Sequence, residues 1–229
     1  MASEKYAFAE GAGSRLITEA CPLCFSVENT FFHRDKQREF LRCSQCALVF
    51  VPTQGHLSKA DEKFYYDLHQ NSPLDSGYRT FLERLSRPLL KQLQSGSQGL
   101  DFGSGPGPTL SLMLEEAGHS VALYDPFYAP DQSVFARQYD FITSSEVVEH
   151  LQAPGRELNR LWALLKPGGV LAIMTKRVID QAAFSRWHYK NDPTHIVFFS
   201  EQTFNWLGKS WQVEPVYCGA DVVFFNKGS

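Results

Sequence analysis

The chain has 229 residues, 43% of them hydrophobic and 21% charged, and its formal net charge at pH 7 is −3. This length accommodates one α/β domain with a small appendage. The slightly negative charge excludes a basic field over the whole protein that would attract nucleic acid, but it does not exclude a local basic groove. Because the chain has neither a signal-peptide pattern nor an apolar run long enough to span a bilayer, we expect a cytoplasmic protein without membrane contact.

Four cysteines organise the first quarter of the chain. Residues 1–18 mix small and charged residues without periodicity, which predicts a flexible leader. Cys21, Cys24, Cys43 and Cys46 then follow with the spacing C-x2-C-x18-C-x2-C, which is typical of a zinc ribbon whose two knuckles complete a tetrahedron of thiolates. With short strands expected at 30–32, 39–42 and 48–51, residues 19–56 would form a module held by one structural Zn²⁺. A pair of disulfides is the alternative, which the missing secretory signal disfavours.

Residues 57–95 have the spacing of helices. Phe64 and Leu68 precede a break at 71–73, and Tyr78, Phe81 and Leu82 follow it. We therefore expect a helical lid or linker that joins the ribbon to a core domain at 96–229.

Residues 98–126 predict a strand, a glycine turn, a helix and a second strand. Gly103, Gly105 and Gly107 let backbone N–H groups approach a ligand closely. Asp125 follows Gly105 at the distance where a carboxylate accepts the hydroxyls of a ribose. A dinucleotide loop would require a third glycine at the position of Pro108, so the spacing here is G-x-G-x-G instead.

The next segment is unusually short. Only 14 residues separate Asp125 from Asp140, and Pro126 and Pro130 disfavour a helix at its start. A helix and a strand that would normally occupy this gap are expected to be shortened or lost.

The rest of the core alternates between strands and helices. A strand at 141–143 leads into an expected helix that carries Glu146, Glu149 and His150 at i, i+3 and i+4, on one face. An amphipathic helix, a buried strand at 170–174, an insertion at 176–200 and a helix at 201–207 capped by Ser200 follow. An antiparallel pair at 213–217 and 222–225 would close the sheet.

Four blocks in this order resemble the motifs of class I S-adenosylmethionine (SAM) methyltransferases: the loop 100–107, then 139–142, 146–151 and 164–169. The resemblance implies a Rossmann-like α/β fold with a seven-stranded sheet, here with one strand shortened or lost, plus the N-terminal zinc ribbon. It also implies that residues 57–95 cover SAM. The cofactor-binding residues that it implies are Asp101, Gly103, Ser104, Gly105, Asp125, Phe127, Ser145 and His69.

The acceptor side is expected in the insertion. Trp187, Tyr189, Phe198 and Phe199 would either wall the acceptor or pack the insertion onto the sheet.

The set Glu146, Glu149, His150 and His195 is similar to that of small-RNA 2′-O-methyltransferases and ubiquinone-pathway O-methyltransferases, and this likeness implies a bound divalent cation, Mg²⁺ or Mn²⁺. Without metal, His195 or His150 is the candidate general base, with Asp192 orienting His195.

We therefore expect a SAM-dependent methyltransferase that acts on a small molecule, at oxygen, with nitrogen and carbon as alternatives. Two other functions stay open. One is an RNA 2′-O-methyltransferase that docks RNA on the ribbon, and the other is a scaffold that binds SAM without catalysis.

Overall fold

The computed structural model describes residues 19–68 and 71–228, so the expected leader 1–18 and His69 lie outside the described residues. The strands are β1 (Asn29–Arg34), β2 (Glu39–Cys43), β3 (Val49–Phe50), β4 (Gln98–Phe102), β5 (Ser120–Tyr124), β6 (Tyr139–Ser145), β7 (Leu165–Met174), β8 (Val197–Phe198), β9 (Pro215–Cys218) and β10 (Val222–Asn226). The helices are α1 (Lys59–Asp67), α2 (Ser76–Leu90), α3 (Thr109–Glu116), α4 (Pro154–Leu164), α5 (Gln181–Ser185) and α6 (Glu201–Trp211). Short 3-10 helices are η1 (Thr53–Gly55), η2 (Gln132–Ala136), η3 (Val148–His150) and η4 (His188–Asn191).

The core is a sheet with strand order β5-β4-β6-β7-β10-β9, six strands within the described ranges. The first four are parallel, and β10 and β9 close the sheet as the predicted antiparallel pair. The expected loss of one strand is confirmed, because only η2 stands between β5 and β6. As a result β5 is an edge strand of this sheet.

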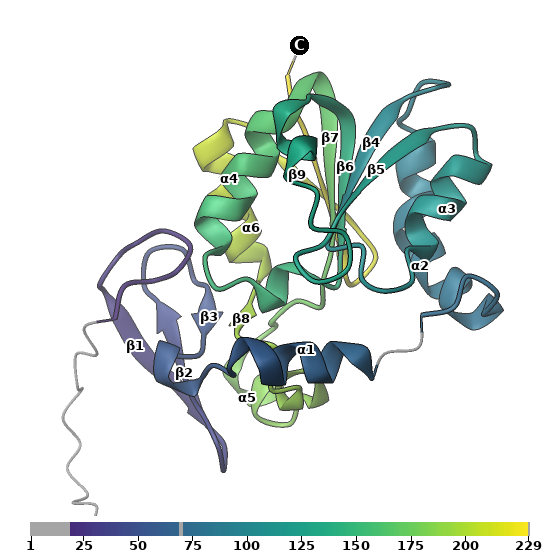
Figure 1. Ribbon diagram of the computed structural model, residues 1–229. Coiled ribbons are helices and arrows are strands. Elements are labelled where there is room, and N and C mark those ends of the chain that lie inside the picture. Colours follow the sequence, from purple (N-terminus) through teal and green to yellow (C-terminus); the bar gives the residue numbers. More distant parts are fainter. Residues whose placement is uncertain (1–18, 69–70, 229) are drawn as a thin grey trace, which may run out of the picture.

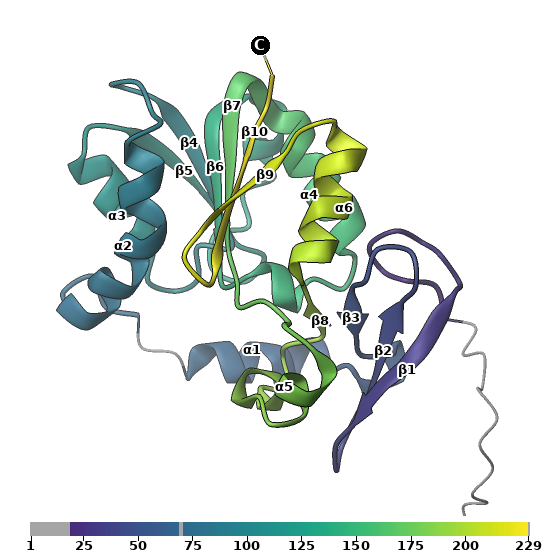
Figure 2. The same cartoon turned by 180° about the vertical axis from the view of Figure 1, so that it is seen from behind.

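Helices cover both faces of the sheet, α2 and α3 on one side and α4 and α6 on the other (Figures 1 and 2). The spacing that predicted α2 is explained by its buried side, where Leu82, Leu85 and Leu89 recur at helical intervals. At the start of α6, Ser200 forms the predicted N-cap, and its hydroxyl accepts from the N–H of Thr203. Neither layer contains a helix long and apolar enough to cross a membrane, among the residues described.

The ribbon is not a separate body. Its antiparallel sheet has the order β1-β2-β3-β8, and β8 is contributed by the core. β3 and β8 pair in the register Val49↔Phe198 and Phe50↔Val197. Phe40 of the ribbon and Phe184 and Phe198 of the insertion pack ring to ring, with centroids 5.1–5.8 Å apart. The ribbon and the insertion therefore share one hydrophobic core.

The carboxyl ends of β4, β5, β6 and β7 face α1 and α5 (Figure 1). A surface hollow of about 510 Å³ lies at the opposite edge, where Gln98, Ser120 and Tyr139 begin their strands. We place the candidate site at the carboxyl edge, because the glycine loop and the titratable side chains lie there, whereas the hollow follows from the missing strand beside β5.

Candidate active site

The loop after β4 has the backbone that the glycine spacing predicts. Gly103 and Gly105 adopt φ values of +83° and +64°, which side chains rarely tolerate. The carboxylate of Asp125 ties this loop to the next turn: Oδ2 accepts from Gly105 N–H at 3.0 Å, and Oδ1 accepts from Phe127 and Tyr128 N–H at 2.8 and 3.1 Å. Asp125 thus sets the distance between two segments that border the same edge of the sheet.

Two further cofactor candidates flank the loop. Asp101 is buried, accepts from the Thr143 hydroxyl at 2.8 Å, and has its pKa raised to about 6 by burial. The buried hydroxyl of Ser104 has no hydrogen-bond partner among the described residues, and an added Cβ at Gly105 would meet open space. An unsatisfied donor beside an open backbone suits a ligand with polar groups, so the loop fits the cofactor that the resemblance implies.

Residues between α1 and α2 approach this loop. The ring of Tyr66 lies 5.3 Å from the ring of His150 and 5.8 Å from that of Phe127. A side chain at Gly107 would collide with the carbonyl of Asn71. The end of α1 therefore bridges the glycine loop and the histidine region.

The prediction of a helix that carries Glu146, Glu149 and His150 is wrong. Glu146 has a left-handed φ of +54°, and only the 3-10 turn η3 follows it. Because this turn replaces an α-helix, the three side chains do not share a face. Glu146 instead lies near the hydroxyl of Tyr189, 3.3 Å from its Oε2.

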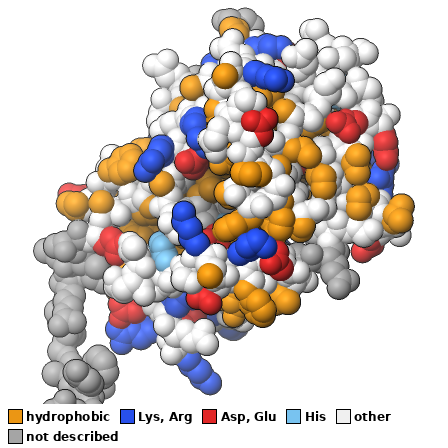
Figure 3. Space-filling model, in the orientation of Figure 1, with side chains coloured by type: hydrophobic (Ala, Val, Ile, Leu, Met, Phe, Trp, Pro, Cys, Tyr) orange, Lys and Arg blue, Asp and Glu red, His pale blue; other side chains and the backbone are white. Residues whose placement is uncertain are grey.

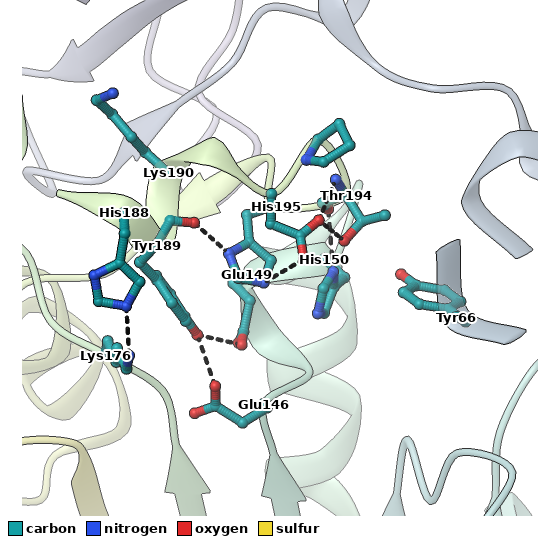
Figure 4. A network of polar contacts seen from close by, with 12 residues as sticks. Tyr66, Glu146, Glu149, His150, Lys176, His188, Tyr189, Lys190, Thr194 and His195 are labelled. Atoms are coloured by element: carbon teal, nitrogen blue, oxygen red, sulfur yellow. Dashed lines mark hydrogen bonds and ion pairs between the residues drawn. The ribbon is translucent and has the colours of Figure 1, made fainter. Parts of the chain in front are cut away.

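Glu149, His150 and His195 come together (Figure 4). Their ligand atoms lie within 4.8 Å of one another, and Glu146 does not belong to this group. The predicted set of four is thus reduced to three by the chain turn at Glu146.

Backbone carbonyls orient both imidazoles. His150 Nδ1 lies 3.1 Å from Thr194 O, and His195 Nδ1 lies 2.7 Å from Tyr189 O. Since a carbonyl oxygen only accepts, each Nδ1 carries a hydrogen, and the lone pair of each neutral ring is on Nε2. Backbone carbonyls are among the usual hydrogen-bond partners of the second ring nitrogen in metal-binding histidines.

The carboxyl group of Glu149 completes the arrangement. Glu149 is fully buried, its Oε1 accepts from the Tyr189 hydroxyl, and its Oε2 has no partner within the described part of the chain. Burial raises the pKa of Glu149 to about 7, and burial together with Glu149 raises the pKa of Glu146 to about 8. Burial, then the nearby His150, lowers the pKa of His195 to about 3. The Nε2 atoms of two imidazoles and the unpaired carboxyl oxygen of Glu149 are a donor set that fits a divalent cation.

The aromatic residues of the insertion divide into two groups. Phe198 and Phe199 are almost fully buried, so they pack the core, as one of the two alternatives expected. Trp187 and Tyr189 lie with ring centroids 5.0 Å apart, and the hydroxyl of Tyr189 contacts Glu146 and Glu149. Asp192 Oδ2 is 3.8 Å from His195 Nε2, so the carbonyl of Tyr189 is the nearer partner of that ring.

The four cysteines of the ribbon converge as the spacing predicts. Sγ of Cys21 is 3.5 Å from Sγ of Cys46, and Sγ of Cys24 is 3.4 Å from Sγ of Cys43. The thiols are not bonded as disulfides, and all four sulfurs lie within 4.8 Å of one another. This donor set fits a tetrahedral zinc ion.

Two positions with a part in the site were missed by sequence reasoning. The sequence suggests Tyr189 as a wall of the acceptor site or as a packing residue, whereas its hydroxyl and its carbonyl both hold site residues. No local sequence pattern distinguishes Arg38 from the other charged residues of the ribbon. Neither role has a sequence signal, since each depends on contacts between segments distant in the chain.

Known proteins resemble this chain in sequence and in fold. A family profile described as a methyltransferase domain matches residues 74–216. A ubiquinone biosynthesis O-methyltransferase of Caulobacter vibrioides is 33% identical over 81 residues, which is 35% of this chain and 25% of that protein. The chain therefore matches only a quarter of the length of this relative.

Two solved structures have a TM-score of 0.50 to this chain. One is a Burkholderia thailandensis 1,6-didemethyltoxoflavin-N1-methyltransferase with its substrate and S-adenosylhomocysteine, 18% identical, with 88% of this chain and all of that chain covered. The other is from a complex of the Haloferax volcanii Trm112 methyltransferase activator with a methyltransferase, 11% identical, with 75% and 98% covered. At these identities the likeness concerns the fold.

Proposed function

The chain belongs to the family of class I SAM-dependent methyltransferase domains, and we propose that it transfers a methyl group from SAM to a small-molecule acceptor, at oxygen. The observation that carries the proposal is the left-handed glycine loop, tied by Asp125 to the turn at Phe127 and bordered by Tyr66. A nucleoside-sized ligand would lie between the glycine loop and the histidine cluster.

On the cofactor side we assign the binding residues already expected from the sequence. Ser104 and the backbone of Gly103 and Gly105 would hold the amino-acid end, and Asp125 would accept from the ribose. Asp101 and Ser145 stand at the ends of the adjoining strands β4 and β6, and Phe127 would border the adenine. When bound, SAM supplies a methyl group that its sulfonium already activates, so the protein's main task is to align the acceptor.

On the acceptor side we propose that Glu149, His150 and His195 hold a divalent cation. Such an ion would lower the pKa of an acceptor hydroxyl. The paired imidazoles favour a transition metal such as Mn²⁺ over Mg²⁺, because Mg²⁺ prefers oxygen ligands. The Caulobacter relative is described as an O-methyltransferase, which supports oxygen as the methylated atom. If no ion binds, the Nε2 lone pair of His195 or His150 is the candidate base.

The ribbon would hold a structural Zn²⁺, which leaves no open coordination position for catalysis. Docking of RNA on this module receives no support from the charges on the visible surface. On the face drawn in Figure 3, Lys and Arg side chains alternate with Asp and Glu and do not gather into one basic patch. A small acceptor therefore agrees better with the net charge of −3.

Binding of S-adenosylhomocysteine to purified protein tests the cofactor assignment. We expect Asp125→Ala to weaken binding by about tenfold or more, because the carboxylate both accepts from the ribose and ties the glycine loop. Asp131→Ala is the matched control, since Asp131 is an exposed aspartate that caps η2 in the segment after Asp125. Titration calorimetry measures both. Wild-type protein that binds neither SAM nor its demethylated product at high micromolar concentration would refute the proposal, and binding without turnover on an acceptor panel would leave only the scaffold alternative.

A further inference from the structure

Arg38 reaches from the ribbon into the acceptor side of the site. It stands at the end of the turn between β1 and β2, and only 8% of its surface is exposed. Its guanidinium donates to four backbone carbonyls of one segment of the core. They are those of Lys190, Asp192 at 3.2 Å, Pro193 at 3.4 Å and His195 at 3.0 Å.

Contacts within the ribbon fix the position of this guanidinium. The carboxylate of Asp35 accepts from the backbone N–H of Gln37 and of Arg38, both at 2.8 Å, and so fixes the turn. The guanidinium carbon lies 5.3 Å from the centre of the Phe40 ring, on the adjoining strand β2. A planar fork with five donors can serve several carbonyls at once, whereas an ammonium acts from a single point.

The segment that Arg38 holds is the one that orients both histidines. Its carbonyls at Tyr189 and Thr194 receive Nδ1–H of His195 and of His150. On its far side, Ile196 N–H donates to Glu149 O at 2.9 Å, and Ile196 O accepts from Val51 N–H at 2.8 Å. The geometry of the cluster therefore depends on how the turn 190–195 is held, and the ribbon holds it from both ends.

We propose that Arg38 is a positioning residue of the active site, through which the ribbon sets the orientation of the His150–His195 pair. The catalytic meaning of this pair rests on the proposed function, but its orientation does not. The ribbon would thereby act on the acceptor side of the site, because its Arg38 braces the turn 190–195 of the core.

The test compares Arg38→Met and Arg38→Lys with Arg34→Met. Arg34 is the matched control because it is an exposed arginine at the end of β1 that pairs with Glu39 at the surface. The first measurement is the tautomer of the histidine rings, by nitrogen-15 NMR at one pH. The second is hydrogen exchange of the backbone amides of 190–196, and the third is the affinity for S-adenosylhomocysteine. Zinc content and circular dichroism establish that each variant is folded.

We expect wild type and Arg34→Met to show His195 as a single tautomer with hydrogen on Nδ1. In Arg38→Met we expect mixed tautomers and amide exchange at 190–196 about tenfold faster or more, with the exchange of β4 and β6 unchanged. Arg38→Lys should lie between these extremes and keeps the test available if Arg38→Met does not fold. Affinity for S-adenosylhomocysteine should stay within about twofold, because the glycine loop is not touched.

Unchanged tautomers and exchange in folded Arg38 variants would overturn the proposal. A uniform rise in exchange across the core would also overturn it, because Arg38 would then support the whole fold rather than this turn. Wild-type protein that fails to bind S-adenosylhomocysteine would instead refute the proposed function and leave the positioning role of Arg38 standing.

Discussion

Tyr189 shows how one residue serves the site through two different groups. Its carbonyl fixes the His195 ring, and its hydroxyl donates to Glu149. A phenol has one hydrogen to donate, so the second carboxyl, Glu146 at 3.3 Å, would best meet the Tyr189 oxygen as a protonated acid. The pKa of Glu146, raised to about 8 by burial and Glu149, agrees with that role.

Metal binding is a prediction at the scale of single residues. We expect wild-type protein to hold an exchangeable divalent ion besides zinc, and Glu149→Gln to lose it, because the ligand group contains Glu149 but not Glu146. Glu146→Gln is the matched control, three residues away and buried beside the same tyrosine, and should keep the ion. Elemental analysis after dialysis against Mn²⁺ measures this. Loss of the ion in both variants would instead favour the four-ligand set.

Asp101 gives a pH-dependent prediction. Burial raises its pKa from 3.8 to about 6, so the folded state binds a proton that the unfolded state releases, and stability falls as pH rises between these values. We expect Asp101→Asn to gain up to about 3 kcal/mol in the free energy of unfolding relative to wild type between pH 4 and pH 6, with no further gain above pH 6.

Urea denaturation of the SAM-free protein at pH 4, 5, 6 and 7 measures this difference. Asp131→Asn is the control of opposite sign, because the backbone N–H of Ser133 lowers the pKa of that exposed carboxylate. A stability difference for Asp101→Asn that does not change with pH would contradict the prediction.

At the scale of elements, the strands were the most predictable part. Short apolar runs indicated β4, β6 and β10, and the short gap after Asp125 indicated the missing strand. The helix expected at Glu146 failed because spacing at i, i+3 and i+4 does not reveal a left-handed residue at the start of a run. That one backbone angle removed Glu146 from the cluster of Glu149, His150 and His195.

At the scale of the whole molecule, the ribbon and the core meet in one sheet and one hydrophobic core. β8 pairs with β3, and the turn before it carries His195. A zinc ion held by the four cysteines would stabilise the ribbon strands. We therefore expect the state of the four cysteines to affect the turn 190–195 through β8.

We expect removal of zinc to loosen the active site without opening the SAM-binding half. Cys43→Ser, or chelation of zinc from wild type, should speed amide exchange at β3, β8 and the turn 190–195, because β8 loses its neighbour strand. Exchange at β4 and β5 should change little. Cys218→Ser is the control outside the ribbon, and adding zinc back to chelated wild type should restore protection. Equal exchange in the presence and absence of zinc would contradict the coupling.

The sequence by itself determined the parts of this protein that are local in the chain. The cysteine knuckles, the glycine loop with Asp125, and most helices and strands follow from spacing, because turn geometry and the burial of one face act within a few residues. Only the tertiary structure decided that β8 completes the ribbon, that Arg38 holds the turn 190–195, and that Glu149, His150 and His195 form a group without Glu146. The contacts of Arg38 join residues up to 157 positions apart, and the backbone carbonyls that accept them are common to every residue type, so these contacts leave no mark in the sequence.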